Sequence, residues 1–106
     1  DALEDIARTP GLDFIQLGPG DLVLSRFGFA PPPVEAAEFV ENAHRKAIDI
    51  ARRVGIRAAA NARNAEHANY LTGLGYDLIF LGCDVLDMQE YYRKELAAFG
   101  GLAAAR

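Results

Sequence analysis

Residues 77–83 read Asp-Leu-Ile-Phe-Leu-Gly-Cys, a nearly continuous apolar run. Such a run is typical of a strand that is buried on both faces of a parallel sheet. Two shorter runs, at residues 12–17 and 56–60, are bounded by glycine, proline or asparagine, as strands commonly are. The sequence therefore predicts three strands, of which the last is buried on both faces.

Helical patterns separate these strands. Between residues 34 and 54, apolar side chains recur every three or four positions among charged ones, which predicts an amphipathic helix. Asn64 or Asn61 can cap a second helix over residues 65–74, and Asp84 is placed to cap a last helix. The order, which starts with a short helix, is strictly alternating, and this implies parallel strands joined by right-handed crossovers. We predict an α/β fold whose two open sheet edges are covered, paired or closed into a barrel.

Composition narrows the class of protein. The 106 residues include 11 Lys plus Arg against 15 Asp plus Glu, a net charge of -4, and 51% of them are hydrophobic. These values favour one globular domain over disorder, and the lack of a dense basic patch argues against binding to nucleic acid or to an anionic membrane surface. No apolar run approaches the roughly 20 residues that cross a bilayer. The single cysteine, Cys83, has no intramolecular disulfide partner, so we expect a cytoplasmic protein.

The connection over residues 18–33 is predicted to be a long loop, far beyond the roughly two to six residues usual between a strand and a helix. Long loops at the carboxyl ends of strands commonly hold the sites of α/β proteins. In its opening, Gly-Pro-Gly-Asp-Leu, the N–H groups of Gly20, Asp21 and Leu22 could converge on an anion such as a carboxylate. Asp21 also supplies a hard oxygen ligand for Mg²⁺ or Mn²⁺. The same residues are common in plain turns, so a turn without a site is the alternative.

Several short motifs follow one another along nearly the whole chain: Asp1-Ala2-Leu3-Glu4, Pro10-Gly11-Leu12-Asp13, Leu17-Gly18-Pro19-Gly20-Asp21-Leu22, Ser25 with Gly28, Tyr70-Leu71, Leu74-Gly75 and Leu81-Gly82-Cys83-Asp84. With these motifs the sequence from Asp1 to Gly101 resembles the C-terminal portion of the HpcH/HpaI aldolase family, the metal-dependent pyruvate aldolases that include 4-hydroxy-2-oxoheptanedioate aldolase. The family usually has alanine where this chain has Gly20, and this departure keeps a small residue.

The resemblance implies a (β/α)8 TIM barrel of the phosphoenolpyruvate/pyruvate type. Such barrels run to about 250 residues, so residues 1–106 would be a partial domain that holds the last three strands and the C-terminal helix. It also implies a class II aldolase that uses Mg²⁺, Mn²⁺ or Co²⁺ to cleave 4-hydroxy-2-oxo acids reversibly to pyruvate and an aldehyde. A homo-oligomer, or association with the missing part of the barrel, is expected.

The resemblance assigns roles to particular residues. Asp21 matches the carboxylate that binds the metal, and the backbone of Gly18, Pro19, Gly20 and Asp21 matches the segment that holds the pyruvate carboxylate. Asn61, at the end of its strand, points toward the same barrel mouth and either contacts the substrate or caps the next helix. The family's second metal carboxylate and its catalytic Arg and His lie upstream of this chain. No catalytic residue is therefore assigned, and the chain alone is expected to show little or no turnover.

Two alternatives stay open. One is a citrate-lyase-like acyl-CoA lyase of the same superfamily, and the other is a non-enzymatic α/β module that binds a small anion or assembles with other chains.

Other residues are predicted to have structural roles. His44 and His67 do not have the spacing of metal ligands and are expected at the surface or on helix flanks. Cys83 is expected to pack as a small apolar residue. An apolar stripe on the last helix is predicted to lie in the core or in a subunit interface: Tyr91, Tyr92, Leu96 and Phe99.

Overall fold

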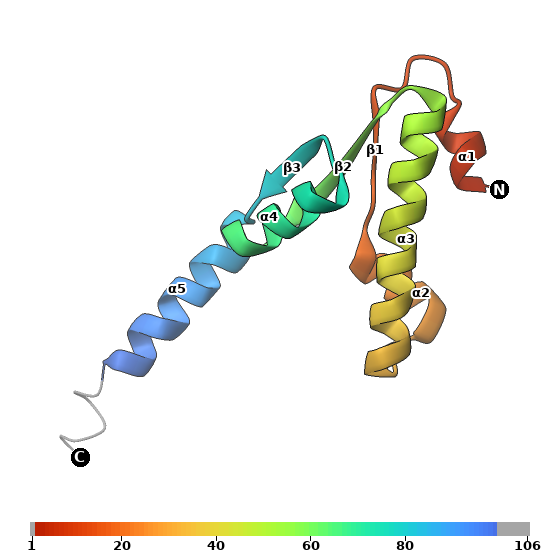
Figure 1. The fold of residues 1–106 in the computed structure, drawn as a ribbon. Coiled ribbons are helices and arrows are strands. Elements are labelled where there is room, and N and C mark those ends of the chain that lie inside the picture. The colour runs from red at the N-terminus through yellow and green to blue at the C-terminus, as the bar shows by residue number, and fades with distance from the viewer. Residues whose placement is uncertain (1, 100–106) are drawn as a thin grey trace.

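The computed structural model describes residues 2–99, and its elements alternate as predicted. In chain order they are α1 (Ala2–Ala7), β1 (Phe14–Gln16), α2 (Pro19–Phe27), α3 (Pro33–Val54), β2 (Arg57–Ala62), α4 (Ala65–Leu74), β3 (Leu78–Leu81) and α5 (Asp84–Ala98) (Figure 1). Asp1 and Gly101, at the two ends of the family resemblance, lie outside the described residues, as does the rest of 100–106.

The three strands form one parallel sheet in the order β1-β2-β3, which confirms the parallel arrangement predicted from the alternation. Gln16 of β1 lies opposite Ala59 of β2, and Asn61 of β2 lies opposite Phe80 of β3. The carboxyl ends of all three strands therefore meet at one edge. The sheet is open, so closure into a barrel stays a prediction.

The core lies on one face of the sheet, beneath α3 and α4. Alternate strand residues point toward these helices, among them Ile15, Ala58 and Ala60, and they pack with Ile50 of α3 and Leu71 of α4. Alanine side chains along β2 let both helices approach the sheet closely. The opposite face carries no helix in the described part of the chain.

The predicted burial of the third strand is wrong. In β3, Leu78 and Phe80 on the face away from the helices are 38% and 40% exposed, and Leu81 at the carboxyl end of the strand is 63% exposed. β3 is an edge strand that pairs only with β2, and α4 covers only one of its faces. An apolar run shows that its side chains favour burial, but nothing within residues 2–99 covers the second face.

The predicted long loop over residues 18–33 is also wrong, because most of it forms the helix α2. Pro19 occupies the first helical position, where its fixed φ is favourable and its missing N–H costs no hydrogen bond. The helix ends at Gly28, whose φ of 73° is available to few other residues. The connection that remains between α2 and α3 is short.

The helix caps follow the predictions in part. Gly55 ends α3 in the left-handed conformation, and the Asn64 side chain accepts a hydrogen bond from the His67 N–H at 2.8 Å, so Asn64 caps α4. Asp84 is the first residue of α5 and not its cap. The N-cap position belongs to Cys83, whose N–H donates to the Asp87 carboxylate at 2.9 Å.

Helix α5 extends away from the other elements (Figure 1). Its apolar side chains are exposed, as in Tyr91, Tyr92, Leu96 and Phe99. These residues are therefore not core within residues 2–99, which corrects one of the two alternatives for the stripe. The chain has a radius of gyration of 18.3 Å, whereas a compact domain of this length has about 13 Å.

Candidate functional site

The predicted binding turn lies at the carboxyl end of β1, where α2 begins. Gly18 precedes the helix and Pro19 is its first residue. The N–H of Leu22 donates to the Gly18 carbonyl at 3.1 Å, so it is not available to a ligand and the predicted set of three donors is reduced. The N–H groups of Gly20 and Asp21 have no acceptor among the described residues, as is usual in the first turn of a helix.

The Asp21 carboxylate folds back over Gly18. A Cβ atom placed on Gly18 would lie 2.8 Å from Asp21 Oδ2, closer than such atoms approach in proteins. The space that a side chain would take at Gly18 is thus taken by the carboxylate. Asp21 is exposed and makes no ion pair with another described residue.

Asn61 lies at the same end of the sheet. Gln16 is opposite Ala59, and the Leu17 N–H donates to the Ala59 carbonyl at 3.4 Å, so Gly18 lies level with Asn61 on the neighbouring strand. The Asn61 side chain is exposed, and Asn64, not Asn61, caps α4. All the residues predicted to bind substrate or metal are therefore brought to one edge of the sheet: Gly18, Pro19, Gly20, Asp21 and Asn61.

The metal ligands within this chain are incomplete. Among residues 2–99, no group of three or more His, Cys, Asp or Glu side chains is arranged to hold a metal ion. Asp21 offers one hard oxygen ligand, and Mg²⁺ is usually bound by one or two carboxylates together with substrate and water. The described residues do not form a metal centre by themselves.

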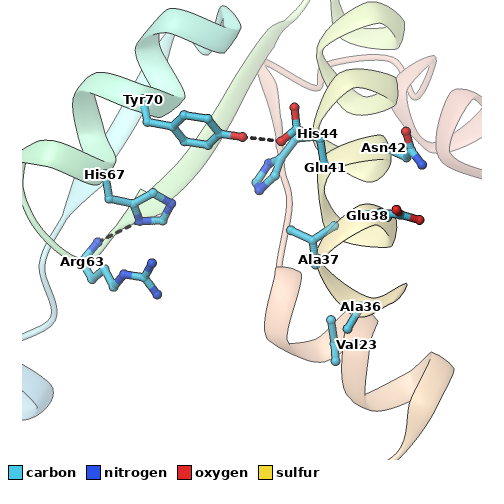
Figure 2. Close-up of a pocket in the computed structure, with 11 residues that line it drawn as sticks. Val23, Ala36, Ala37, Glu38, Glu41, Asn42, His44, Arg63, His67 and Tyr70 are labelled. Atoms are coloured by element: carbon cyan, nitrogen blue, oxygen red, sulfur yellow. Dashed lines mark hydrogen bonds between the residues drawn. The ribbon is translucent and has the colours of Figure 1, made fainter. Parts of the chain in front are cut away.

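A groove of about 930 Å³ lies on the helical side of the same end of the sheet, between α3 and α4 (Figure 2). Glu41 and His44 of α3 face Tyr70 and His67 of α4 across it, and Arg63 lies at its end. The Tyr70 hydroxyl donates to the Glu41 carboxylate and so links the two helices.

His44 is buried, at 5% exposure, which corrects the predicted surface position. Its Nδ1 lies 2.6 Å from the Tyr76 hydroxyl, and the two rings meet edge to face. Burial lowers the pKa of His44 and raises the pKa of Tyr76 to about 12. A sequence signal was present, because His44 precedes Ala47 and Ile48 by one helical turn and therefore shares their buried face.

The second histidine, His67, is half-buried on the flank of α4, as predicted. Its Nδ1 accepts a hydrogen bond from the Arg63 N–H at 3.4 Å. Cys83 follows β3 and is exposed, so the prediction that it packs as a small apolar residue is wrong for the described part of the chain. Neither residue lies with Asp21 in a cluster of metal ligands.

Among the comparisons with known proteins, the search of solved structures is informative. No family model matches the sequence, and no curated protein matches it. A solved structure does match, with a TM-score of 0.72 and 26% sequence identity: an HpcH/HpaI aldolase/citrate lyase family protein from Burkholderia cenocepacia J2315. The resemblance to the HpcH/HpaI family is confirmed.

The match covers 93% of this chain and 37% of the HpcH/HpaI protein. The chain thus spans well under half the length of that relative. In the described residues no helix is both long and apolar enough to cross a membrane.

Proposed function

We propose that this chain is part of a metal-dependent lyase of the HpcH/HpaI kind, which cleaves 4-hydroxy-2-oxo acids reversibly to pyruvate and an aldehyde. The observation that carries the proposal is the position of the Asp21 carboxylate, which lies over Gly18 at the carboxyl end of a parallel strand. In open and closed α/β sheets alike, this end is where ligands bind. The rest of the barrel, with its catalytic Arg and His and a second carboxylate, would come from outside the chain.

The chain's own groups would bind and orient the pyruvate part of the substrate. The free N–H groups of Gly20 and Asp21 point out of the first turn of α2, where the helix dipole favours an anion. They would hold the substrate carboxylate, and the Asp21 carboxylate beside them would supply one ligand to Mg²⁺, Mn²⁺ or Co²⁺. When bound, such an ion acts as a Lewis acid that stabilises the charge on the pyruvate enolate.

The first prediction tests this assignment in the intact protein. We expect Asp21→Ala to lower the rate of pyruvate release from a 4-hydroxy-2-oxo acid by at least about 100-fold. The reason is that the substitution removes a ligand of the metal, and a bound metal stabilises the charge of the transition state by several kcal/mol. Pyruvate release is measured with a coupled dehydrogenase, with each of the three metals added after treatment with a chelator.

Asp13→Ala is the matched control, since Asp13 is also an exposed aspartate but precedes β1 at the opposite end of the strand. It should retain full activity. Full activity of Asp21→Ala would disprove the assignment. Activity that requires coenzyme A would instead favour the citrate-lyase-like acyl-CoA lyase, and an intact protein without either activity would favour a non-enzymatic module.

A further inference from the structure

The face of the sheet that no described helix covers has its own pattern of side chains. From the amino to the carboxyl ends of the strands it presents Phe14 and Gln16 of β1, Arg57, Ala59 and Asn61 of β2, and Leu78 and Phe80 of β3. The rings of Phe14 and Phe80 approach to 6.3 Å across the middle strand. They meet over Ala59, which explains why this alanine is buried on an otherwise open face.

Two carboxamides mark the carboxyl end of this face. Gln16 lies opposite Ala59, and Asn61 is the next residue of β2 on the same face, so the two amides are on neighbouring strands one step apart. At this diagonal spacing long side chains can reach a common partner. Both amides are exposed, and neither side chain hydrogen-bonds to another described residue. Their carbonyl oxygens and NH₂ groups are free to accept and donate.

This end of the face carries no cation among the described residues. Arg57 pairs with Phe14 at the opposite end of the strands. Arg26 is in the last turn of α2, with its guanidinium 5.9 Å from the Phe27 ring. Arg63 follows Asn61 by two residues, but it lines the groove between α3 and α4 on the helical side of the sheet. A negatively charged group on the second substrate would therefore have no ionic partner among the described residues at this end of the face.

We infer that Gln16 and Asn61 select the aldehyde substrate, and that they favour a polar, uncharged 2-hydroxyaldehyde over an alkyl aldehyde or one that carries a carboxylate. The inference rests on the proposed function. Gly18 and Asp21 lie beside Asn61, so an aldehyde that meets the pyruvate held there reaches both amides. An aldehyde hydroxyl would donate to one amide and accept from the other. A methyl group in its place would leave both amides without this partner where the substrates exclude water, which weakens binding in the transition state.

The reaction itself needs no further reactant. In the synthetic direction, C3 of the pyruvate enolate forms a bond to the aldehyde carbon, and the aldehyde oxygen takes up a proton. Glycolaldehyde and propanal are suitable probes because they differ only by a hydroxyl in place of a methyl group. Succinic semialdehyde serves as the probe with a carboxylate.

The test is a comparison of kcat/KM for these aldehydes in the intact protein with pyruvate and Mg²⁺. We expect the wild-type protein to favour glycolaldehyde over propanal and over succinic semialdehyde by at least about tenfold, the effect of one neutral hydrogen bond. Asn61→Leu and Gln16→Met keep the size of each side chain and should each lower the ratio of glycolaldehyde to propanal by about tenfold.

Asn69→Leu is the matched control, because Asn69 is an exposed amide on α4 in the helical layer, and it should leave the ratio unchanged. A wild-type protein without the preference overturns the inference, even if the variants fail to fold. An unchanged ratio in both folded variants also overturns it. In either case pyruvate aldolase activity would remain, whereas a protein with no aldolase activity at all would overturn the proposed function itself.

Discussion

At the scale of single residues, the absence of a side chain at Gly18 is what makes room for the Asp21 carboxylate. The backbone of Gly18 has a φ of -104°, which alanine also adopts, so Gly18→Ala should fold normally. The alanine methyl group would nevertheless lie 2.8 Å from Asp21 Oδ2, so the Asp21 carboxylate would have to move away. We expect weaker binding of Mn²⁺, measured by isothermal titration calorimetry on the intact protein, with an unchanged melting temperature.

Gly20→Ala provides the comparison for that variant. Nothing lies within 4 Å of a Cβ atom at Gly20, and the residue is in the first turn of α2, where alanine is the better helix former. This variant should keep its affinity for Mn²⁺ and gain up to about 1 kcal/mol in free energy of unfolding. Equal Mn²⁺ affinity in both alanine variants would contradict the role given to Gly18.

At the scale of secondary-structure elements, α3 is tied to α4 and β3 by two hydrogen bonds whose partners titrate. Tyr70 of α4 bonds to Glu41, and Tyr76, just before β3, bonds to the buried His44. Burial lowers the pKa of His44, with a weaker opposing effect from Glu41 and a weaker reinforcing effect from His67.

The folded state therefore binds a proton on His44 less readily than the unfolded state, whose pKa is about 6.5. The contribution of neutral His44 to the free energy of unfolding is therefore fully present above pH 6.5. It is lost as the pH falls from this value toward the lower pKa that His44 has in the folded state. We expect the free energy of unfolding, measured with urea from pH 7.5 to pH 5, to fall in this window. His44→Gln should make the fall smaller, and an unchanged slope in that variant would contradict the prediction. The Glu41 pKa is lowered by its bond to Tyr70, so Glu41 titrates below this window.

The elements also show what the sequence could and could not predict. Alternation, parallel pairing and the ends of α3 and α4 were predictable because Gly55, Asn64 and Gly75 leave strong local signals. The helix α2 was missed because Gly-Pro-Gly-Asp has the composition of a turn. The exposure of β3 and the burial of His44 depend on which elements pack together, and local composition does not determine this. The cluster of Gly18, Asp21 and Asn61 was predictable from strand order. That the Leu22 N–H bonds to the Gly18 carbonyl, and so cannot bind a ligand, could be seen only from the backbone geometry.

At the scale of the whole molecule, the elongated shape and the exposed apolar stripe of α5 point to a surface that is covered in the intact protein. We propose a homo-oligomer, or contact with the rest of the barrel, in which α5 buries Tyr92, Leu96 and Phe99. For the homo-oligomer, Leu96→Glu should lower the mass measured by light scattering after size-exclusion chromatography, because it places a charge in the apolar stripe. Glu95→Gln, on the neighbouring position, should not. A wild-type protein that is a well-behaved monomer would contradict the oligomer.

The alternation of side chains along β2 has a consequence for how such a protein can change. Ala58, Ala60 and Ala62 lie beneath the helices, where a larger side chain would force the two layers apart. Asn61 stands between them on the other face and touches none of that packing. Selection for a new substrate can therefore act on one face of a single strand while selection for folding acts on the other. Substrate specificity can therefore change among related proteins while the fold stays the same.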